Sequence, residues 1–276
     1  MMSKTAIIIV THNAEKVIEH CLDAIAGQSV PPEQVVVVDS GSHDKGYLAH
    51  IEDNDTVKVL VRRENIGFAR ANNLGITYIK DDIEYVLFLN PDTLLQRECI
   101  HLATRYMEND PASGAITGLL RGYDFDRAGP TGRLDSTGIF RKWYGRWYDR
   151  GQGEDEKGQY LNPQDIPAAC GAFLFCRLEA LKQAALSERI IFDEEFFLYK
   201  EDIELCLRMR KAGWKIRYVP ELSAFHGRGW QGDRKSMGRN LRRTAALSEV
   251  LLYKKHPSPY ILWALLKYFL VVSFDI

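Results

Sequence analysis

Acidic side chains follow two apolar runs of the sequence, at the points where strands would end. Asp39 follows the run Val35–Val38, and Asp92 follows Tyr85–Leu89 in the motif Asn-Pro-Asp. A carboxylate can accept a hydrogen bond from N3 of uracil or thymine, and it can hold a hard divalent cation on the phosphates of a nucleotide. These residue types favour nucleotide binding at Asp39 and metal binding at Asp92. The alternative for both is a turn or a helix N-cap.

A second group of candidates lies later in the chain. Glu201 and Asp202 follow a run of aromatic residues and open a stretch with helical spacing. A carboxylate among apolar side chains can be desolvated, which raises its basicity towards that of a general base. The alternative is that the acidic pair only complements the helix dipole. His226 precedes a glycine-rich loop with Arg228 and Trp230, which could close over a diphosphate and place the imidazole on a metal.

Four apolar runs without polar alternation predict parallel strands that are covered on both faces. They are Ala6–Val10, Val35–Val38, Val57–Val61 and Tyr85–Leu89. The stretches between them have helical spacing, so we expect an α/β fold with a Rossmann-like, mostly parallel central sheet and helices on both faces. Right-handed crossovers bring the carboxyl ends of such strands to one edge, where open sheets bind ligands.

The second half of the chain has a weaker pattern. Residues 121–162 show no periodicity, and their aromatic and basic side chains suit either a glycan acceptor or a small satellite core. Further on, the pattern predicts order over 168–176, a helix near 178–185, a helix over 201–212 and a short strand over 216–219.

The composition is typical of a globular protein. The 276 residues include 36 Lys and Arg and 37 Asp and Glu, so the net charge of −1 gives no reason to expect nucleic acid. The five cysteines are scattered among apolar neighbours and predict buried, reduced thiols and a cytoplasmic protein. The turn Thr11-His12-Asn13 after the first strand lacks the glycines of a dinucleotide site and the basic loop of a sugar-phosphate nucleotidyltransferase.

The C-terminal part combines basic and apolar residues. Seven Lys and Arg lie between Arg234 and Lys255, and Tyr260–Phe274 is almost entirely apolar. That run is shorter than the roughly 20 residues that span a bilayer. It predicts a helical extension whose residues 234–274 contact the inner face of the cytoplasmic membrane. The alternative is packing on the domain or on a second subunit of a homodimer.

Several motifs, taken in order, resemble those of one enzyme family. The sequence contains Val-Thr-His-Asn at 10–13, Asp-Ser-Gly-Ser at 39–42, Asn-Ile-Gly-Phe-Ala-Arg at 65–70, Asn-Pro-Asp at 90–92 and Glu-Asp-Ile-Glu at 201–204. This combination, between about residues 6 and 230, resembles the inverting glycosyltransferases of family 2, which have the GT-A fold. The branch it most resembles is that of bacterial rhamnosyltransferases.

The resemblance implies a role for each candidate residue. The nucleotide-sugar would be bound by Thr11, Asn13, Asp39, Asn65, Gly67, Arg70 and Asn90, with Asp39 on the base. Asp92 and His226 would hold Mg²⁺ or Mn²⁺, and Asp202 would be the catalytic base. Glu201, Arg228 and Trp230 would contact the acceptor or form a lid. Many relatives have an aspartate where this chain has Asn90, which weakens the expectation of a metal.

The resemblance also implies a reaction and a division of the chain. We expect inverting transfer of L-rhamnose from dTDP-rhamnose to a hydroxyl of a glycan or lipid-linked glycan in bacterial polysaccharide or O-antigen synthesis. The alternatives are a UDP-hexose or galactofuranose donor, and a binding subunit without catalysis. Residues 1–232 would form the catalytic domain, with a nucleotide-binding half over 1–120 and an acceptor-binding half over 121–232, and residues 233–276 the extension.

Overall fold

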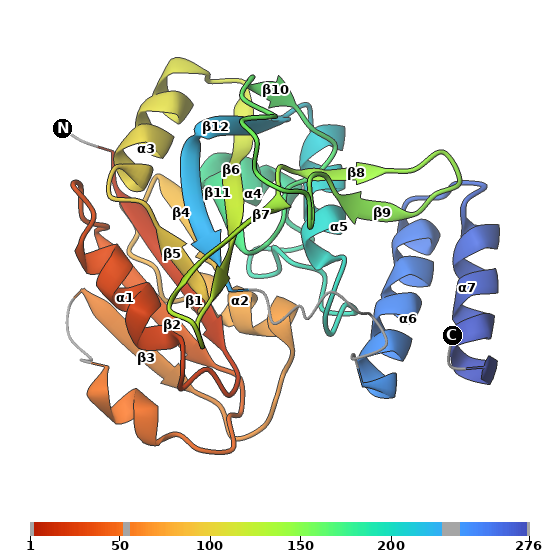
Figure 1. The fold of residues 1–276 in the computed structure, drawn as a ribbon, viewed down its shortest axis with the longest axis horizontal. Helices are drawn as coiled ribbons and strands as arrows, with labels where there is room; N and C mark the ends of the chain where they lie inside the picture. Colours follow the sequence, from red (N-terminus) through yellow and green to blue (C-terminus); the bar gives the residue numbers. More distant parts are fainter. Residues whose placement is uncertain (1–2, 52–55, 228–237, 275–276) are drawn as a thin grey trace.

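The computed structural model describes residues 3–51, 56–227 and 238–274 and has an α/β architecture (Figure 1). The strands are β1 (Thr5–Thr11), β2 (Gln34–Asp39), β3 (Val57–Val61), β4 (Tyr85–Leu89), β5 (Thr93–Leu95), β6 (Ser113–Asp124), β7 (Gly129–Ser136), β8 (Ile139–Arg141), β9 (Trp147–Asp149), β10 (Gln164–Asp165), β11 (Phe173–Arg177) and β12 (Lys215–His226). The helices are α1 (Ile18–Ala26), α2 (Phe68–Ile76), α3 (Cys99–Asn109), α4 (Leu178–Ala184), α5 (Glu201–Lys211), α6 (Arg239–Lys255) and α7 (Ile261–Phe274), with a 3₁₀ helix at Gly46–His50.

The first four strands form a parallel half-sheet, as predicted. In the large sheet the order is β10-β12-β6-β11-β4-β1-β2-β3, and β1 pairs in parallel with both β2 and β4. In this register Thr11 lies opposite Asp39, the last residue of β2. The carboxyl ends of β1, β2 and β4 therefore meet at one edge, which places the polar residues that follow them close together.

Helices cover both faces of this half-sheet. On one face Gln28, just after α1, hydrogen-bonds to the backbone at the start of α3. On the other face Gly75 of α2 lies so close to β1 that a Cβ atom there would be 2.6 Å from Ile8. Asn73 of α2 also bonds to the backbone at Phe192, which precedes α5. Strands β1, β2 and β4 between these layers are almost fully buried, because they present apolar side chains to both, whereas the edge strand β3 is partly exposed.

The second half of the sheet is mixed. β11 runs antiparallel to β4 and β6, whereas β12 runs parallel to β6. The predicted short strand over 216–219 is only the start of β12, which continues to His226. Pro220 interrupts the apolar pattern, and the register between β12 and β6 shifts between Tyr218 and Ser223. This continuation matters because it carries His226 back to the carboxyl edge.

The prediction that residues 121–162 lack regular structure is wrong. The segment contains the end of β6, the strand β7 and the hairpin of β8 and β9. These strands are short and partly exposed, so their sequence alternates too little to be recognised. Most of the aromatic residues form a satellite cluster, in which Arg141 stacks on Trp147 and Tyr260. Trp143, at the tip of the hairpin, is instead 85 % exposed.

The C-terminal residues form two antiparallel helices, as the sequence predicts. α6 lies between the sheet and α7 (Figure 1), and it is joined to the rest of the protein by the Tyr253 hydroxyl, which donates to the carbonyl of Gly145. The buried Glu249 of α6 pairs with Lys267 of α7. The predicted boundary at residue 232 lies outside the described residues. In the described ranges, we find no helix whose length and apolar content would let it cross a membrane.

Candidate functional site

Asp39 organises the loop at the end of β2. Its side chain is fully buried, and Oδ2 accepts hydrogen bonds from the hydroxyls of Ser42, Tyr47 (3.0 Å) and Thr11 (3.3 Å). Oδ1 accepts one bond from the Ser42 backbone N–H at 3.1 Å. Oδ1 thus retains one lone pair that can accept a further hydrogen bond. The predicted contact with a nucleotide base stays a prediction, and it would require the loop over Asp39 to open.

The neighbouring loops bring Asn13, Asn65 and Gly67 to the same edge. The backbone N–H of Asn13 donates to the Ser42 hydroxyl at 2.8 Å. Asn65 accepts bonds from the Ser40 hydroxyl (3.1 Å) and from the backbone of Gly67 (2.9 Å). Gly67 has φ of +80°, a conformation that side chains rarely adopt. These bonds join the end of β2 to the start of α2.

The side chain of Arg70 extends from the first turn of α2 towards the loop before α5. Its guanidinium lies 3.4 Å from Glu194 and is 58 % exposed. The side chain can therefore move towards a phosphate at little cost, because an exposed ion pair contributes little stability.

His226 forms the centre of a buried polar cluster. Its Nε2 lies 3.2 Å from Asp92 Oδ1 and 3.3 Å from Asn90 Nδ2, and its Nδ1 lies 2.8 Å from Asp135 Oδ2. The backbone N–H of Gly227 donates to the carbonyl of Asp92 at 2.8 Å. The two predicted metal ligands, Asp92 and His226, are thus neighbours although 134 positions separate them in the sequence.

The imidazole of His226 offsets part of the negative charge of this cluster. Burial alone would lower the pKa of His226, but the carboxylates of Asp92 and Asp135 outweigh it and raise that pKa to about 9. Burial would raise the pKa of Asp92, and the imidazole of His226 lowers it below its usual value. His226 therefore links two carboxylates that would otherwise repel each other.

The fit of this cluster to a divalent cation is partial. Across residues 3–51, 56–227 and 238–274, no group of three or more His, Cys, Asp or Glu is placed to hold a metal ion. Asp92 and His226 offer two donors. A cation that bridges a diphosphate needs only one or two protein ligands, because phosphate oxygens and water complete its shell. The residues therefore suit a cation brought with a nucleotide diphosphate better than a permanent one.

Asp202 lies at the start of α5 with both carboxylate oxygens engaged by backbone. Oδ2 accepts from the N–H of Gly171 at 3.0 Å, and Oδ1 from the N–H of Ile203 at 2.7 Å. Burial raises the pKa of Asp202, and the N–H of Gly171 is the main group that opposes this rise. Glu201 is also buried, and its Oε2 has no hydrogen-bond partner among the described residues. Burial, and then the charge of Asp202, raise the pKa of Glu201 to about 8.

Backbone contacts connect these loops into one site. The N–H of Phe68 donates to the carbonyl of Phe197 at 2.9 Å, which ties the Asn65–Gly67 loop to the segment before Asp202. On the other side, Gly171 holds Asp202, and the adjacent Ala172 accepts from the backbone of Asn90 at 3.2 Å. The structure therefore brings the residues of the four predicted loops to one edge. Arg228 and Trp230 lie outside the described residues.

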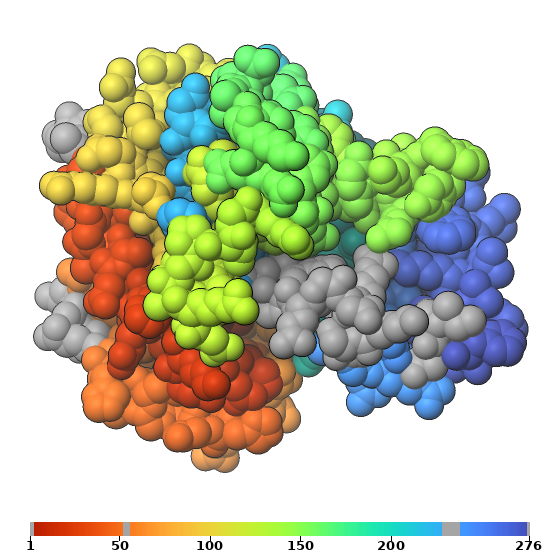
Figure 2. All heavy atoms as spheres, viewed as in Figure 1, coloured from red at the N-terminus to blue at the C-terminus, as the bar shows by residue number. Residues whose placement is uncertain are grey.

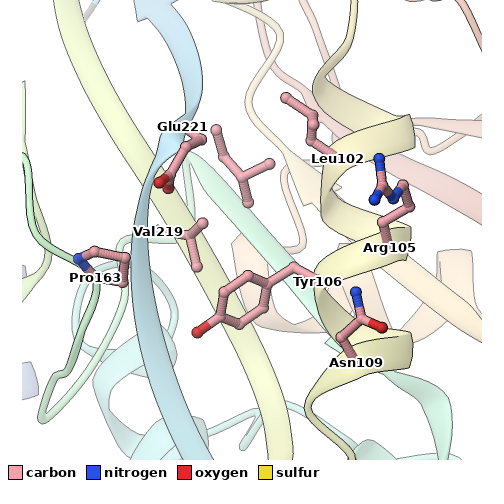
Figure 3. Close-up of a pocket in the computed structure, with 8 residues that line it drawn as sticks. Leu102, Arg105, Tyr106, Asn109, Pro163, Val219 and Glu221 are labelled. Carbon is pink, nitrogen blue, oxygen red and sulfur yellow. The ribbon is translucent and has the colours of Figure 1, made fainter.

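A separate cavity lies away from this edge. It has a volume of about 250 Å³ and lies between α3 and β12, beside Pro163 (Figure 3). Tyr106 and Arg105 of α3 and Glu221 of β12 line it. Its lining includes none of the predicted site residues, and the volume is below the roughly 300–1,000 Å³ of typical ligand sites.

Sequence reasoning missed two residues that shape the site. Asp135 contacts His226, and Tyr47 contacts Asp39. Asp135 lies in the segment that was expected to be irregular, although a carboxylate directly after Leu134 and before Ser-Thr-Gly could have indicated a strand end at an active site. Tyr47 offers no such signal, because its contact depends on the 3₁₀ helix of the loop.

Solved structures of known proteins share this fold. GalNAc-T7, solved with UDP, GalNAc and Mn²⁺, has a TM-score of 0.66 and 17 % identity, covering 97 % of this chain and 54 % of that one. The mannosyltransferase PcManGT from Pyrobaculum calidifontis, solved with GDP-Man and Mn²⁺, has a TM-score of 0.63 and 18 % identity. The match covers 100 % of this chain and 71 % of that one. These are GT-A glycosyltransferases, so the predicted GT-A fold is confirmed.

Sequence comparison agrees with the fold. The rhamnosyltransferase WbbL of Escherichia coli K12 is 24 % identical over 230 residues, 80 % of this chain and 82 % of that protein. The N-acetylglucosaminyl-diphospho-decaprenol L-rhamnosyltransferase of Mycobacterium tuberculosis is 25 % identical over 234 residues, which cover 80 % of this chain and 75 % of that protein. The model of glycosyl transferase family 2 matches residues 6–184, which end before Glu201 and His226. The chain therefore belongs to glycosyl transferase family 2 and is a glycosyltransferase.

Proposed function

We propose that this glycosyltransferase moves L-rhamnose from dTDP-rhamnose to a hydroxyl group of a glycan or lipid-linked glycan, with inversion at the anomeric carbon. The names of the two rhamnosyltransferase relatives support the sugar and, in one of them, a lipid-linked acceptor. The single observation that carries the reaction is the position of the half-buried Asp202, held by the backbone of Gly171 next to the loop of Asn90 and Asp92. A UDP-hexose or galactofuranose donor is the alternative.

In this proposal Asp202 accepts the proton of the acceptor hydroxyl while the hydroxyl oxygen attacks the anomeric carbon. The bond from that carbon to the diphosphate breaks on the opposite face, so a single displacement inverts the configuration. The raised pKa of Asp202 makes its carboxylate a stronger base than that of an ordinary aspartate. The N–H of Gly171 fixes the carboxylate, so little reorganisation is needed at the moment of transfer.

Asp92 and His226 are the residues that would hold Mg²⁺ or Mn²⁺ on the diphosphate. When bound, such a cation neutralises the negative charge that develops on the leaving group. Asp135 would keep the Nδ1 proton of His226 and so leave Nε2 directed at Asp92 and the cation. Asn90, which replaces a carboxylate of many relatives, reduces the charge of the site and supports binding of the cation together with the nucleotide.

The donor can be identified by stabilisation of the folded protein. We expect dTDP-rhamnose with Mn²⁺ to raise the melting temperature more than UDP-glucose, UDP-galactofuranose or Mn²⁺ alone, because a ligand that binds only the folded state stabilises it by mass action. Differential scanning fluorimetry measures this. A larger rise with a UDP-sugar would assign the donor to the alternative class.

Asp202→Asn should separate binding from transfer. The amide oxygen can still accept from Gly171, so the fold and nucleotide binding should persist, whereas transfer should fall by about 10²–10⁴-fold. Release of the nucleoside diphosphate with a glycan acceptor measures transfer, and calorimetry with dTDP measures binding. Asp126→Asn, at the exposed turn between β6 and β7, is the control. Undiminished transfer by Asp202→Asn would exclude this residue as the base.

The pH dependence of transfer should distinguish the two acids. The base must be ionised, so kcat/KM should fall as the pH drops through the pKa of Asp202, at a pH above that of an ordinary aspartate. Glu201, with its pKa of about 8, is mostly protonated below that pH. Glu201→Gln should consequently leave the acidic limb of the profile in place. A limb that moves with Glu201→Gln would make Glu201 the base.

Asp135→Asn should weaken binding of the cation without removing either of its two predicted ligands. Loss of a partner of a metal-binding histidine typically reduces metal affinity by about 10–100-fold. We expect that loss for Mn²⁺ in the presence of dTDP, measured by the electron paramagnetic resonance signal of free Mn²⁺. Binding of dTDP alone should change little. Equal Mn²⁺ affinity in Asp135→Asn and Asp126→Asn would contradict the role of Asp135.

A further inference from the structure

The outward face of α7 is apolar and uncovered by the described residues. Its side chains Leu262, Leu265, Leu266, Phe269 and Phe274 are between 46 % and 72 % exposed. The spacing of the first four places them on one side of the helix, opposite Ala264 and Val271, which are buried. Phe274, the last residue of α7, contacts the ring of Phe269. A large apolar surface of this kind on a globular protein marks a site of interaction with another protein or a membrane.

The β8–β9 hairpin extends this face beyond the helix. Trp143 at its tip packs edge-on against Tyr144, which packs in the same way against Trp263 of α7, with ring centroids 5.4 Å and 5.2 Å apart. Gly145 contacts Tyr260, just before α7 begins. In Figure 2 the yellow-green hairpin lies directly against the blue helices. We call the five side chains above together with Trp143 the α7 face.

Basic residues lie at both ends of the α7 face. Residues 239–274 contain six Lys and Arg and one acidic residue, Glu249, which pairs with Lys267. Their net charge is +5, whereas the rest of the chain carries −6, because the total is −1. Arg239 and Arg243 lie at one end of the face, beside the carbonyl of Val272, and Lys142 lies in the hairpin at the other end.

We propose that the α7 face rests in the interface of a membrane that contains anionic lipids. Apolar side chains would enter the boundary between headgroups and acyl chains, and the flanking cations would contact lipid phosphates. Tryptophan at the tip of the hairpin suits this boundary, since its ring is apolar and its N–H is polar. A second copy of the chain fits less well, because pairing this face with itself would bring two positively charged surfaces together.

The other side of the helix pair contacts the segment that leads to Asp202. The Ser248 hydroxyl of α6 donates to the carbonyl of Leu198 at 2.9 Å, and Lys255 lies 2.6 Å from Asp193. His256 lies 3.3 Å from Glu204 of α5. A membrane at the α7 face would therefore lie one helix layer from the segment that precedes the base. This placement suits a lipid-linked acceptor, and this last step rests on the proposed function.

Vesicle binding tests the α7 face without reference to sugar transfer. We expect the full chain to float with phosphatidylglycerol vesicles and much less with phosphatidylcholine vesicles, and salt should weaken the binding. Leu266→Glu combined with Phe269→Glu should reduce binding by at least about 10-fold, because two charges would enter the apolar boundary. Leu161→Glu, at an equally exposed leucine outside the face, should bind as the wild type does.

Circular dichroism and dTDP binding establish that the double variant is folded. The proposal is wrong if the wild type ignores phosphatidylglycerol vesicles or if the double variant binds them equally well. Light scattering after gel filtration tests the alternative that a second copy of the chain covers the α7 face. If the wild type is a dimer, the double substitution dissociates it and the wild type does not bind vesicles, the α7 face is a subunit interface. A failed donor assay would leave these results unchanged, so the two proposals fail separately.

Discussion

The close approach of Gly67 to Phe197 is the contact on which the arrangement of the site depends. A Cβ atom at position 67 would lie 2.5 Å from the carbonyl oxygen of Phe197, and that same oxygen accepts the N–H of Phe68. The segment before α5 is thereby fixed against the first turn of α2. Asp202 follows five residues later, and Gly171 can bind it only in this position. A glycine just before α2 thus helps to position an acid in the first turn of α5.

The second constraint is the burial of His226 between two carboxylates. Desolvation opposes the charge of Asp92, and the imidazole of His226 lowers the pKa of Asp92 below its usual value. The same imidazole contacts both carboxylates. A divalent cation would have to displace the proton on Nε2, so the proton and the metal compete for the same atom.

Much of this fold could be predicted from sequence, because the parallel strands are buried on both faces and read as continuous apolar runs. The bounds of β3 and β4 agree with the predicted runs, and the edge they define contains the predicted polar loops. The strands of the segment 121–162 could not be predicted, since β8 and β9 have three residues each, the segment bends at glycines with positive φ, and contacts between aromatic and basic side chains stabilise it. Asp135 was missed for the same reason. Long-range partners such as Tyr47 depend on loop geometry that no local pattern records.

The C-terminal helices show how a surface far from the nucleotide loops can bear on the same chemistry. α6 is not part of the central sheet layers. Its residues Ser248 and Lys255 nevertheless contact the segment 193–198, which also contacts Gly67. Two residues with positive φ, Tyr199 and Lys200, follow that segment directly before Glu201. Such backbone persists only where its surroundings hold it from several directions. Displacing α6 would remove one of these supports, so the position of the helix pair and the geometry of the two acids are physically linked.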